Sequence, residues 1–419
     1  MLKICRIAIA VSLSLSSISL FALETTDNID ELPILAPESQ HATSSKRVTA
    51  QFTRTHYTKI KMDDVLSEKI FDRYVKQLDY ARNVFLATDI NDFQKYRYEF
   101  DRIIARGKLD IPYEIFNLNL QRRLERYEYA LSLLDKPFDY TTDEVYNFDR
   151  EDAAWPKDIA ELNELWRLKV KYDALNLTLA GKEWPKIQEV LGKRYRYAIK
   201  RLKQSESEDV FQVVMNSFAR VVEPHTSYLS PRNAEKFQMD MNLSLEGIGA
   251  VLRAEEDYTV IQSVVSGGPA DKSKRLKPKD KIVGVSQAEK DFVDVIGWRL
   301  DDVVDLIKGP KGTKVRLQIL SGEAESDANL KIVSIIREKI KLEDRAAKSE
   351  VYFENSDENS SKKLGVITIP SFYNNLSRDV KKEIAKLKEQ EVQGIIIDLR
   401  GNGGGSLPEA TLLTGLFID

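Results

Sequence analysis

The pattern of residues changes at Ser244, and this change constrains the fold of the 419-residue chain more than any other feature. Before it, over residues 63–233, apolar residues recur at helical spacing. Leu66, Ile70 and Tyr74, for example, stand four residues apart with charges between them, which predicts amphipathic helices. After Ser244, glycines and β-branched residues take over, which is typical of short strands and tight turns. A chain of this length also exceeds one ordinary core, so Ser244 marks a domain boundary.

The segment after this boundary predicts a small β-rich domain. Five or six short strands and one helix within roughly eighty residues are typical of a partly open β-barrel. In chain order, we expect strands at 250–252, 259–264, 280–285 and 314–320, with a helix at 300–308.

The pattern changes again at Leu364. A strand at 365–369, a helix at 376–390 and a strand at 394–399 follow in turn, and this alternation predicts a parallel sheet. The expected fold class is therefore a multidomain α+β protein. Its expected parts are a signal peptide (1–22), a helical domain (23–235), the partly open barrel (240–325) and the incomplete start of an α/β core (335–419).

The charge of the chain narrows the class of partner. Lysine and arginine number 63 against 66 aspartates and glutamates, so the formal net charge is only −3. Such a balance lacks the basic excess that nucleic-acid binding requires. The composition favours a protein or peptide partner.

The first residues predict export from the cytoplasm. Lys3 and Arg6 precede the apolar run 7–21, which ends beside the small residue Ala22. This pattern is typical of a secretory signal that is cleaved after Ala22, and a retained membrane anchor is the alternative. The single cysteine, Cys5, lies inside this segment, so the cleaved chain would have no disulfide and no thiolate chemistry. Membrane association of that chain would be at most peripheral.

The segment Leu245-Glu246-Gly247-Ile248-Gly249-Ala250 predicts a site for a peptide carboxylate. Two glycines around an apolar residue, directly before a strand, let successive backbone N–H groups converge on one point. A peptide could place its C-terminal carboxylate there and add to the strand edge. The predicted helix would supply the other wall through Val304 and Ile307. A tight hairpin that binds no ligand is the alternative.

A second glycine segment, Arg400-Gly401-Asn402-Gly403-Gly404-Gly405, follows the buried strand predicted at 394–399. Its backbone N–H groups would point outward at the start of a helix, an arrangement that binds anions. The alternative is that these glycines only shape a strand-to-helix turn. Ser406 next to them fits an N-cap role better than a nucleophile's, since no Gly-x-Ser-x-Gly elbow surrounds it.

Other common site types find little support. His41, His56 and His225 are dispersed, so neither a Ser-His-Asp triad nor a zinc site is predicted. Residues 309–313 lack the spacing of a phosphate-binding loop and follow a helix instead of a strand. No cofactor is expected.

Several of these segments, taken together and in this order, resemble the tail-specific, C-terminal-processing serine proteases. Residues 245–250, 267–270, 280–285 and 306–313 are similar to the PDZ domain of that family, and 398–405 resembles its oxyanion loop. Residues 40–43 and 71–74 resemble the N-terminal stretch of its long, Gram-negative form, and 224–232 resembles the segment that joins the helical region of that form to the PDZ domain.

The resemblance implies a periplasmic endopeptidase that binds substrate C-termini through the PDZ domain and acts on cell-envelope proteins. It implies a serine nucleophile activated by a lysine, with Gly405 as the oxyanion donor. Peptide binding would fall to Leu245, Gly247, Ile248, Gly249 and Ala250 on one side and to Val304 and Ile307 on the other. Protein or peptide C-terminal tails are the implied partners, together with a periplasmic lipoprotein adaptor.

One departure from the family accompanies this resemblance. The serine and lysine of the family lie beyond the position of Asp419, so we expect these 419 residues to be inactive by themselves. The alternative function is a non-catalytic module that binds peptide tails. The strand that contains Ile395, Ile396 and Ile397 should then show an open edge and an uncovered apolar face.

Overall fold

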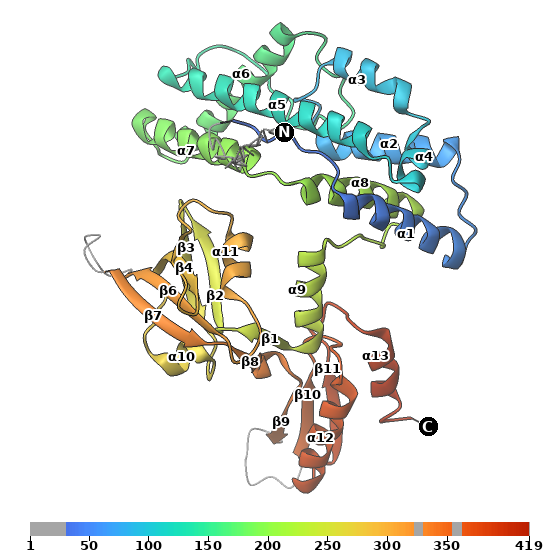
Figure 1. The fold of residues 1–419 in the computed structure, drawn as a ribbon, viewed down its shortest axis with the longest axis vertical. Helices are drawn as coiled ribbons and strands as arrows, with labels where there is room; N and C mark the ends of the chain where they lie inside the picture. The colour runs from blue at the N-terminus through green and yellow to red at the C-terminus, as the bar shows by residue number, and fades with distance from the viewer. Residues whose placement is uncertain (1–30, 322–329, 354–362, 419) are drawn as a thin grey trace, which may run out of the picture. The chain divides into compact units, whose positions relative to one another are not determined.

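The computed structural model describes residues 31–321, 330–353 and 363–418, which form two compact units. The first unit ends at Thr226 and the second begins at Ser227. The expected signal peptide at residues 1–22 lies outside the described residues. The expected fold class is confirmed, because helical, barrel-like and α/β parts follow one another along the chain (Figure 1).

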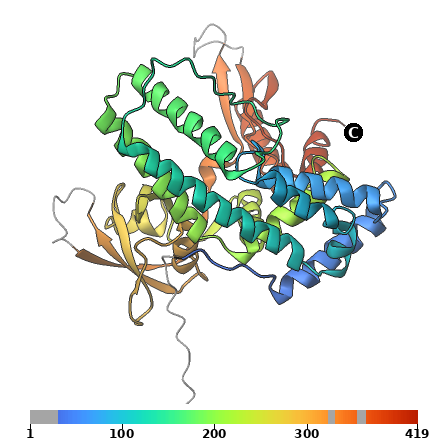
Figure 2. The same cartoon turned by 90° about the horizontal axis from the view of Figure 1, so that it is seen from above.

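The first unit consists of helices. In chain order they are α1 (Ser39–Thr55), α2 (Asp64–Leu78), α3 (Ala87–Phe93), α4 (Phe100–Arg106), α5 (Asp110–Ser132), α6 (Ile159–Leu179), α7 (Trp184–Lys203) and α8 (Ser207–Val222). The long helices α5, α6 and α7 pack against one another and lie side by side in both views (Figures 1 and 2). The core of the unit is rich in fully buried aromatic rings, among them Phe71, Tyr74, Phe85, Phe100, Tyr113, Phe211 and Phe218.

Local sequence explains where several of these helices begin and end. Asp63 starts α2 by accepting a hydrogen bond from the Leu66 amide at 3.0 Å, which satisfies a donor that the helix leaves free. At the end of α4, Gly107 adopts a φ of +65°, and a β-carbon there would lie only 2.6 Å from the Ala42 carbonyl oxygen. Both the conformation and the close approach of α1 therefore require glycine.

The second unit opens with α9 (Pro231–Asn242) and a β-rich domain. The elements of this domain are β1 (Ser244–Gly247), β2 (Ala250–Glu255), β3 (Tyr258–Val264), α10 (Pro269–Ser273), β4 (Lys281–Gln287), β5 (Val293–Asp294), α11 (Leu300–Ile307), β6 (Lys314–Leu320), β7 (Leu330–Ile336) and β8 (Glu338–Lys341). Each predicted strand and the predicted helix are present within a few residues of the expected bounds.

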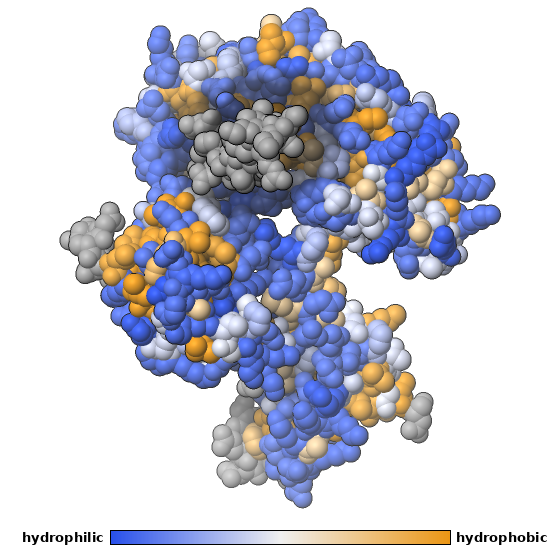
Figure 3. Space-filling view, viewed as in Figure 1, coloured by the Kyte–Doolittle hydropathy of each residue, from blue (hydrophilic) through white to orange (hydrophobic). Residues whose placement is uncertain are grey.

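The larger sheet of this domain does not close into a barrel. Its strands follow the order β2-β3-β4-β6-β7, with β5 paired to β4, while β1 and β8 form a separate antiparallel ribbon. Strand β2 is thus an edge of the sheet, and helix α11 packs beside it. At the opposite edge, Leu330, Ile332 and Ile336 of β7 are about half exposed, and Figure 3 shows hydrophobic surface over β6 and β7.

The rest of the second unit is a three-stranded sheet in the order β11-β10-β9. Its elements are β9 (Lys348–Phe353), β10 (Lys363–Thr368), α12 (Leu376–Glu389), β11 (Gly394–Asp398) and α13 (Leu407–Thr414). The predicted parallel pairing of β10 and β11 is confirmed, with Leu364 opposite Gly394. Strand β9, which pairs antiparallel to β10, was not predicted. Strand β11 is an edge, and Ile396 on it is 49% exposed.

Candidate functional site

The loop between β1 and β2 points two backbone amides away from residues 265–270 of the same domain. The Ile248 carbonyl accepts a hydrogen bond from the Ala270 amide, and the Gly249 carbonyl accepts one from the Val265 amide, each at 2.8 Å. In a trans peptide plane, a carbonyl and the following N–H point in opposite directions. The N–H groups of Gly249 and Ala250 therefore face away from Val265 and Ala270, as the predicted carboxylate site requires.

The two glycines of this loop have different reasons to be glycine. Gly249 has a φ of +74°, and a β-carbon there would lie 2.9 Å from the Cδ1 atom of Ile340. Gly247 has no such backbone conformation, and the atom nearest to an added β-carbon would be Leu245 Cδ1 at 3.9 Å. The spacing of the glycines alone gives both positions equal weight, whereas the structure requires glycine only at Gly249.

The predicted side-chain contacts differ in accessibility. Leu245, Ala250 and Val304 are half-buried, so a ligand could touch them. Ile248 and Ile307 are each only 3% exposed and belong to the hydrophobic core of the domain. Ile248 can therefore act through its backbone, and Ile307 supports the helix from beneath.

Arg337 supports the same site and was missed by sequence reasoning. This residue connects β7 to β8 and is 2% exposed. Its guanidinium donates to the Ile307 carbonyl at 2.8 Å, to Gln287 Oε1 at 2.7 Å and to Thr313 Oγ1 at 2.9 Å. It thus holds the C-terminal end of α11, where a cation is favourable.

Burial lowers the pKa of Arg337 from its ordinary value, and its fork of donors suits the carbonyl and amide oxygens around it. The same guanidinium explains part of the motif at residues 306–313. A β-carbon at Gly309, whose φ is +156°, would lie 2.9 Å from the Cζ atom of Arg337. The only sequence signal for Arg337 is a charge that follows the strand pattern Leu330–Ile336, which is too weak to find it.

In the loop after β11, a carbonyl is again held by a neighbouring amide, so that the next N–H group points the other way. The Gly404 carbonyl accepts from the Phe372 amide at 2.9 Å, and the Ser406 amide donates to the Phe372 carbonyl at 2.7 Å. The Gly405 N–H lies in the same peptide plane as the Gly404 carbonyl, so it points away from Phe372. Asn402 fixes the turn, since its side chain donates to the Ile369 carbonyl and accepts from the Gly404 amide.

Both the backbone conformation at position 405 and the lack of room for a β-carbon require glycine there. Its φ is +143°, and a β-carbon there would overlap the carbonyl oxygen of Phe372 and lie 2.8 Å from the carbonyl carbon. Ser406 caps α13, because its hydroxyl accepts from the Glu409 amide at 3.4 Å. At the start of the loop, Arg400 donates to Asp398 and lowers the pKa of that carboxyl to about 2.

The histidines are accounted for by structure. His41 is 1% exposed, its Nε2 lies 3.0 Å from Glu208 Oε2, and its ring stacks on Phe211. His56 is half-buried and His225 is exposed. Across residues 31–321, 330–353 and 363–418, no group of three or more histidine, cysteine, aspartate or glutamate side chains could hold a metal ion. Within those same ranges, every helix is too short or too polar to cross a membrane.

Three families match successive parts of the chain. They are described as the tail specific protease N-terminal domain (residues 48–232), the PDZ domain (residues 236–320) and peptidase family S41 (residues 363–419). The matches follow one another along the chain, and the PDZ match contains the β1–β2 loop.

Similar proteins cover the chain to different extents. The tail-specific protease of Haemophilus influenzae is 48% identical over 418 residues, which are 99% of this chain and 59% of that protein. The carboxy-terminal processing protease CtpA of Bacillus subtilis is 33% identical over 47% of this chain and 38% of its own length. The chain thus spans less than two thirds of either relative.

A solved structure is similar to the β-rich domain. It is the PDZ domain of a carboxy-terminal protease from Vibrio cholerae in complex with a peptide, 60% identical. The alignment covers 24% of this chain and 100% of that one, with a TM-score of 0.23.

Proposed function

We propose, on the premise that this chain belongs to the tail-specific protease family, that it captures exposed C-termini of substrate proteins for cleavage by a serine endopeptidase. The capture site is the β1–β2 loop with the open edge of β2. The periplasm is the proposed compartment, and proteins of the cell envelope are the proposed substrates.

The observation that carries the proposal is the outward direction of the Gly249 and Ala250 amides at the start of an edge strand. A terminal carboxylate would accept from these two N–H groups, and the residues before it would pair with β2. Hydrogen bonds to a charged group contribute about 1.5–3 kcal/mol each. The half-buried Val304 on α11 would contact the last side chain of the tail, which favours an apolar residue there.

The proposed role of the second loop is to stabilise the tetrahedral oxyanion. The Gly405 N–H is fixed by its neighbours and faces away from them, so it costs no reorganisation when charge develops. One such donor is commonly worth about 2.7–4 kcal/mol of transition-state stabilisation. The nucleophilic serine and its lysine base are placed outside these 419 residues, as the resemblance implies. A lysine whose pKa is lowered by burial can accept the serine proton.

A non-catalytic module that binds peptide tails is the alternative function. The position of Ser406 favours it, since the hydroxyl beside the candidate oxyanion donor caps a helix. A lipoprotein adaptor and a cleaved signal peptide remain proposals that rest on the resemblance and on residues 1–22.

Tail capture is tested by fluorescence anisotropy with a labelled ten-residue peptide that ends in an apolar residue. We expect the peptide with a free C-terminus to bind at least tenfold more tightly than its C-terminal amide, because the amide cannot act as a carboxylate. Equal affinities would contradict the capture site. Incubation of the purified chain with a protein that ends in an apolar tail separates the two functions, since cleavage by the 419 residues would remove the proposal that serine and lysine lie elsewhere.

A further inference from the structure

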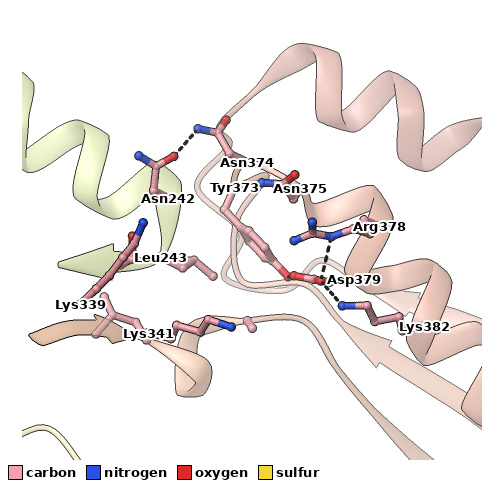
Figure 4. Close-up of a pocket in the computed structure, with 13 residues that line it drawn as sticks. Asn242, Leu243, Lys339, Lys341, Tyr373, Asn374, Asn375, Arg378, Asp379 and Lys382 are labelled. Atoms are coloured by element: carbon pink, nitrogen blue, oxygen red, sulfur yellow. Dashed lines mark hydrogen bonds and ion pairs between the residues drawn. The ribbon is translucent and has the colours of Figure 1, made fainter. Parts of the chain in front are cut away.

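The second unit contains a cavity of about 520 Å³ whose walls come from the β1–β8 ribbon and from α12 with the loop before it. Figure 4 shows Lys339 and Lys341 of β8 on one side of it, and Arg378, Asp379 and Lys382 of α12 on the other. A cavity of this size falls in the range of small-molecule sites, about 300–1,000 Å³. Neither loop described above lines it.

The charges around this cavity are unbalanced. Four of the lining side chains are cationic and Asp379 is the one lining carboxylate. Asp379 is already paired with cations of its own helix, since Lys382 lies 3.2 Å and Arg378 3.8 Å from its Oδ1 atom. The Tyr373 hydroxyl donates to its other oxygen at 3.3 Å. The carboxylate thus has three partners from the α12 side and cannot also neutralise the lysines of β8.

Other cations near β8 have an ion-pair partner, whereas the two lysines of β8 that line the cavity have none among the described residues. Lys272 lies 2.9 Å from Glu338, and Arg345 lies 2.7 Å from Asp240. Lys339 and Lys341, by contrast, have no ion-pair partner within the described ranges 31–321, 330–353 and 363–418. They stand two positions apart on β8, so they share the face of the ribbon that lines the cavity.

The remaining lining groups suit an anion. Asn242, Asn374 and Asn375 add amide groups, and the Asn374 Nδ2 atom donates to Asn242 Oδ1 at 2.8 Å. The N-terminus of α12 does not add to this set, because the Glu409 carboxylate already accepts from the Asn375 amide at 2.7 Å and from the Ser377 amide at 3.0 Å. Buried Tyr373 keeps its proton, because burial raises the pKa of its hydroxyl to about 12.

We propose that this cavity binds a small polyanion, a molecule with two or more carboxylate or phosphate groups that bridge Lys339 and Lys341 to Arg378 and Lys382. A single carboxylate would satisfy only one wall. A polyanion would join the ribbon that continues into the capture loop to the helix of the three-stranded sheet. The site is independent of tail capture and of catalysis, because it uses neither loop.

Isothermal titration calorimetry on the full chain tests the site, with citrate and pyrophosphate as probes and acetate as the single-charge control. All titrations are run at 150 mM NaCl with ionic strength matched, which screens weak surface attraction. We expect saturable binding of one citrate or pyrophosphate per chain and no measurable binding of acetate. Tighter binding of pyrophosphate would identify phosphate groups as the preferred source, and tighter binding of citrate would identify carboxylates.

Two double variants make the test specific. The Lys339→Gln/Lys341→Gln variant should bind the probe at least tenfold more weakly, since each lost charge pair costs on the order of a few-fold or more in affinity. The control is Lys381→Gln/Lys388→Gln, which removes two exposed lysines of α12 that do not line the cavity. It should bind like the wild type.

Three results would overturn the proposal. The first is that neither polyanion binds saturably at millimolar concentrations up to tenfold above that of the protein. The second is an equal loss of affinity in both double variants. The third is that acetate binds as well as the polyanions. A circular dichroism melt of each variant checks that the fold is retained. Because tail-peptide affinity is measured separately, failure of this site leaves the capture proposal standing, and the reverse also holds.

Discussion

The two glycine loops of the second unit orient their amides in the same way but are anchored differently. In each loop a carbonyl is held by a neighbouring amide, so the next N–H points outward. A β-carbon at Gly249 would meet the end of the Ile340 side chain, whereas one at Gly405 would meet the backbone of Phe372. A side-chain end can rotate away, but backbone in a paired segment cannot. The β1–β2 loop should therefore tolerate change better than the loop after β11.

The largest expected effect comes from Gly405→Ala. The added β-carbon would overlap the Phe372 carbonyl at a φ of +143°, so we expect a loss of about 3 kcal/mol or more in unfolding free energy. Urea denaturation of the full chain, followed by fluorescence, measures it. If Gly405 is the oxyanion donor, as proposed above, the rate of a form that cleaves substrate should fall by about 10²–10³-fold.

Gly403→Ala is the matched control for that variant. Gly403 lies in the same loop, but an added β-carbon would have no atom within 4 Å and its φ is outside the left-handed region. Its unfolding free energy should change by less than about 0.5 kcal/mol. If the two variants were equally stable, the backbone anchor at Phe372 would not be the cause of the requirement for glycine.

The next effect concerns the support of the C-terminal end of α11. Arg337→Lys keeps a positive charge but loses the fork that reaches Ile307, Gln287 and Thr313 together. We expect a loss of about 2–3 kcal/mol in stability, because buried acceptors lose their donor. Tail-peptide affinity should also fall, because α11 loses its C-terminal anchor.

Arg275→Lys is a suitable control for the Arg337 variant. Arg275 is exposed and donates to the Ile332 carbonyl at 3.1 Å, so the same exchange should cost less than about 0.5 kcal/mol. Unchanged peptide affinity in Arg337→Lys would show that the wall formed by α11 does not depend on this anchor.

A smaller effect separates the two glycines of the β1–β2 loop. Gly249→Ala should cost about 1–2 kcal/mol, since a left-handed backbone is unfavourable for residues with a β-carbon while the Ile340 side chain can yield. Gly247→Ala should be close to neutral in stability. Thermal melts and peptide anisotropy measure both variants. If both variants lost peptide affinity equally, the two glycines would be equally important for binding, as their spacing in the sequence suggests.

The smallest effect is a pH dependence beside the loop after β11. The pKa of Asp398 falls from its ordinary 3.8 to about 2 in the folded chain, because Arg400 donates to it. Its contribution to stability is therefore complete above the unfolded pKa and is lost as the pH falls through about 2. Arg400 is 90% exposed, so solvent screens the pair. An NMR titration should show the carboxyl inflection near pH 2, shifted toward about 4 in Arg400→Gln. An inflection near 4 in both proteins would contradict the pairing.

Much of the fold could be predicted because its signals are local. The alternation from strand to helix to strand in residues 365–399 gave β10, α12 and β11, and the glycine and β-branched pattern gave β2, β3, β4 and β6. Strand β9, Lys348–Phe353, was missed because its alternation of polar and apolar residues is short and weak. Its pairing with β10 decides its conformation.

The residues of the candidate site also differ in whether a local sequence signal predicts them. Gly249, Ala250 and Gly405 could be proposed as site residues because glycine spacing before a strand or helix is a sequence signal. Arg337 was not, since nothing near it in the sequence shows that its partners are Gln287, Ile307 and Thr313. The cavity beside α12 was missed for the same reason, because its lysines and its asparagines come from distant segments.

The sequence by itself determined which segments form helices, strands and glycine turns, because those choices depend on residues close together in the chain. Only the tertiary structure decided which amides face outward, which glycine is indispensable and which charges remain without a partner. Those properties depend on the neighbours that pack against each residue. Gly247 and Gly249 look alike in the sequence, and only the presence of Ile340 beside one of them, together with its backbone angle, tells them apart.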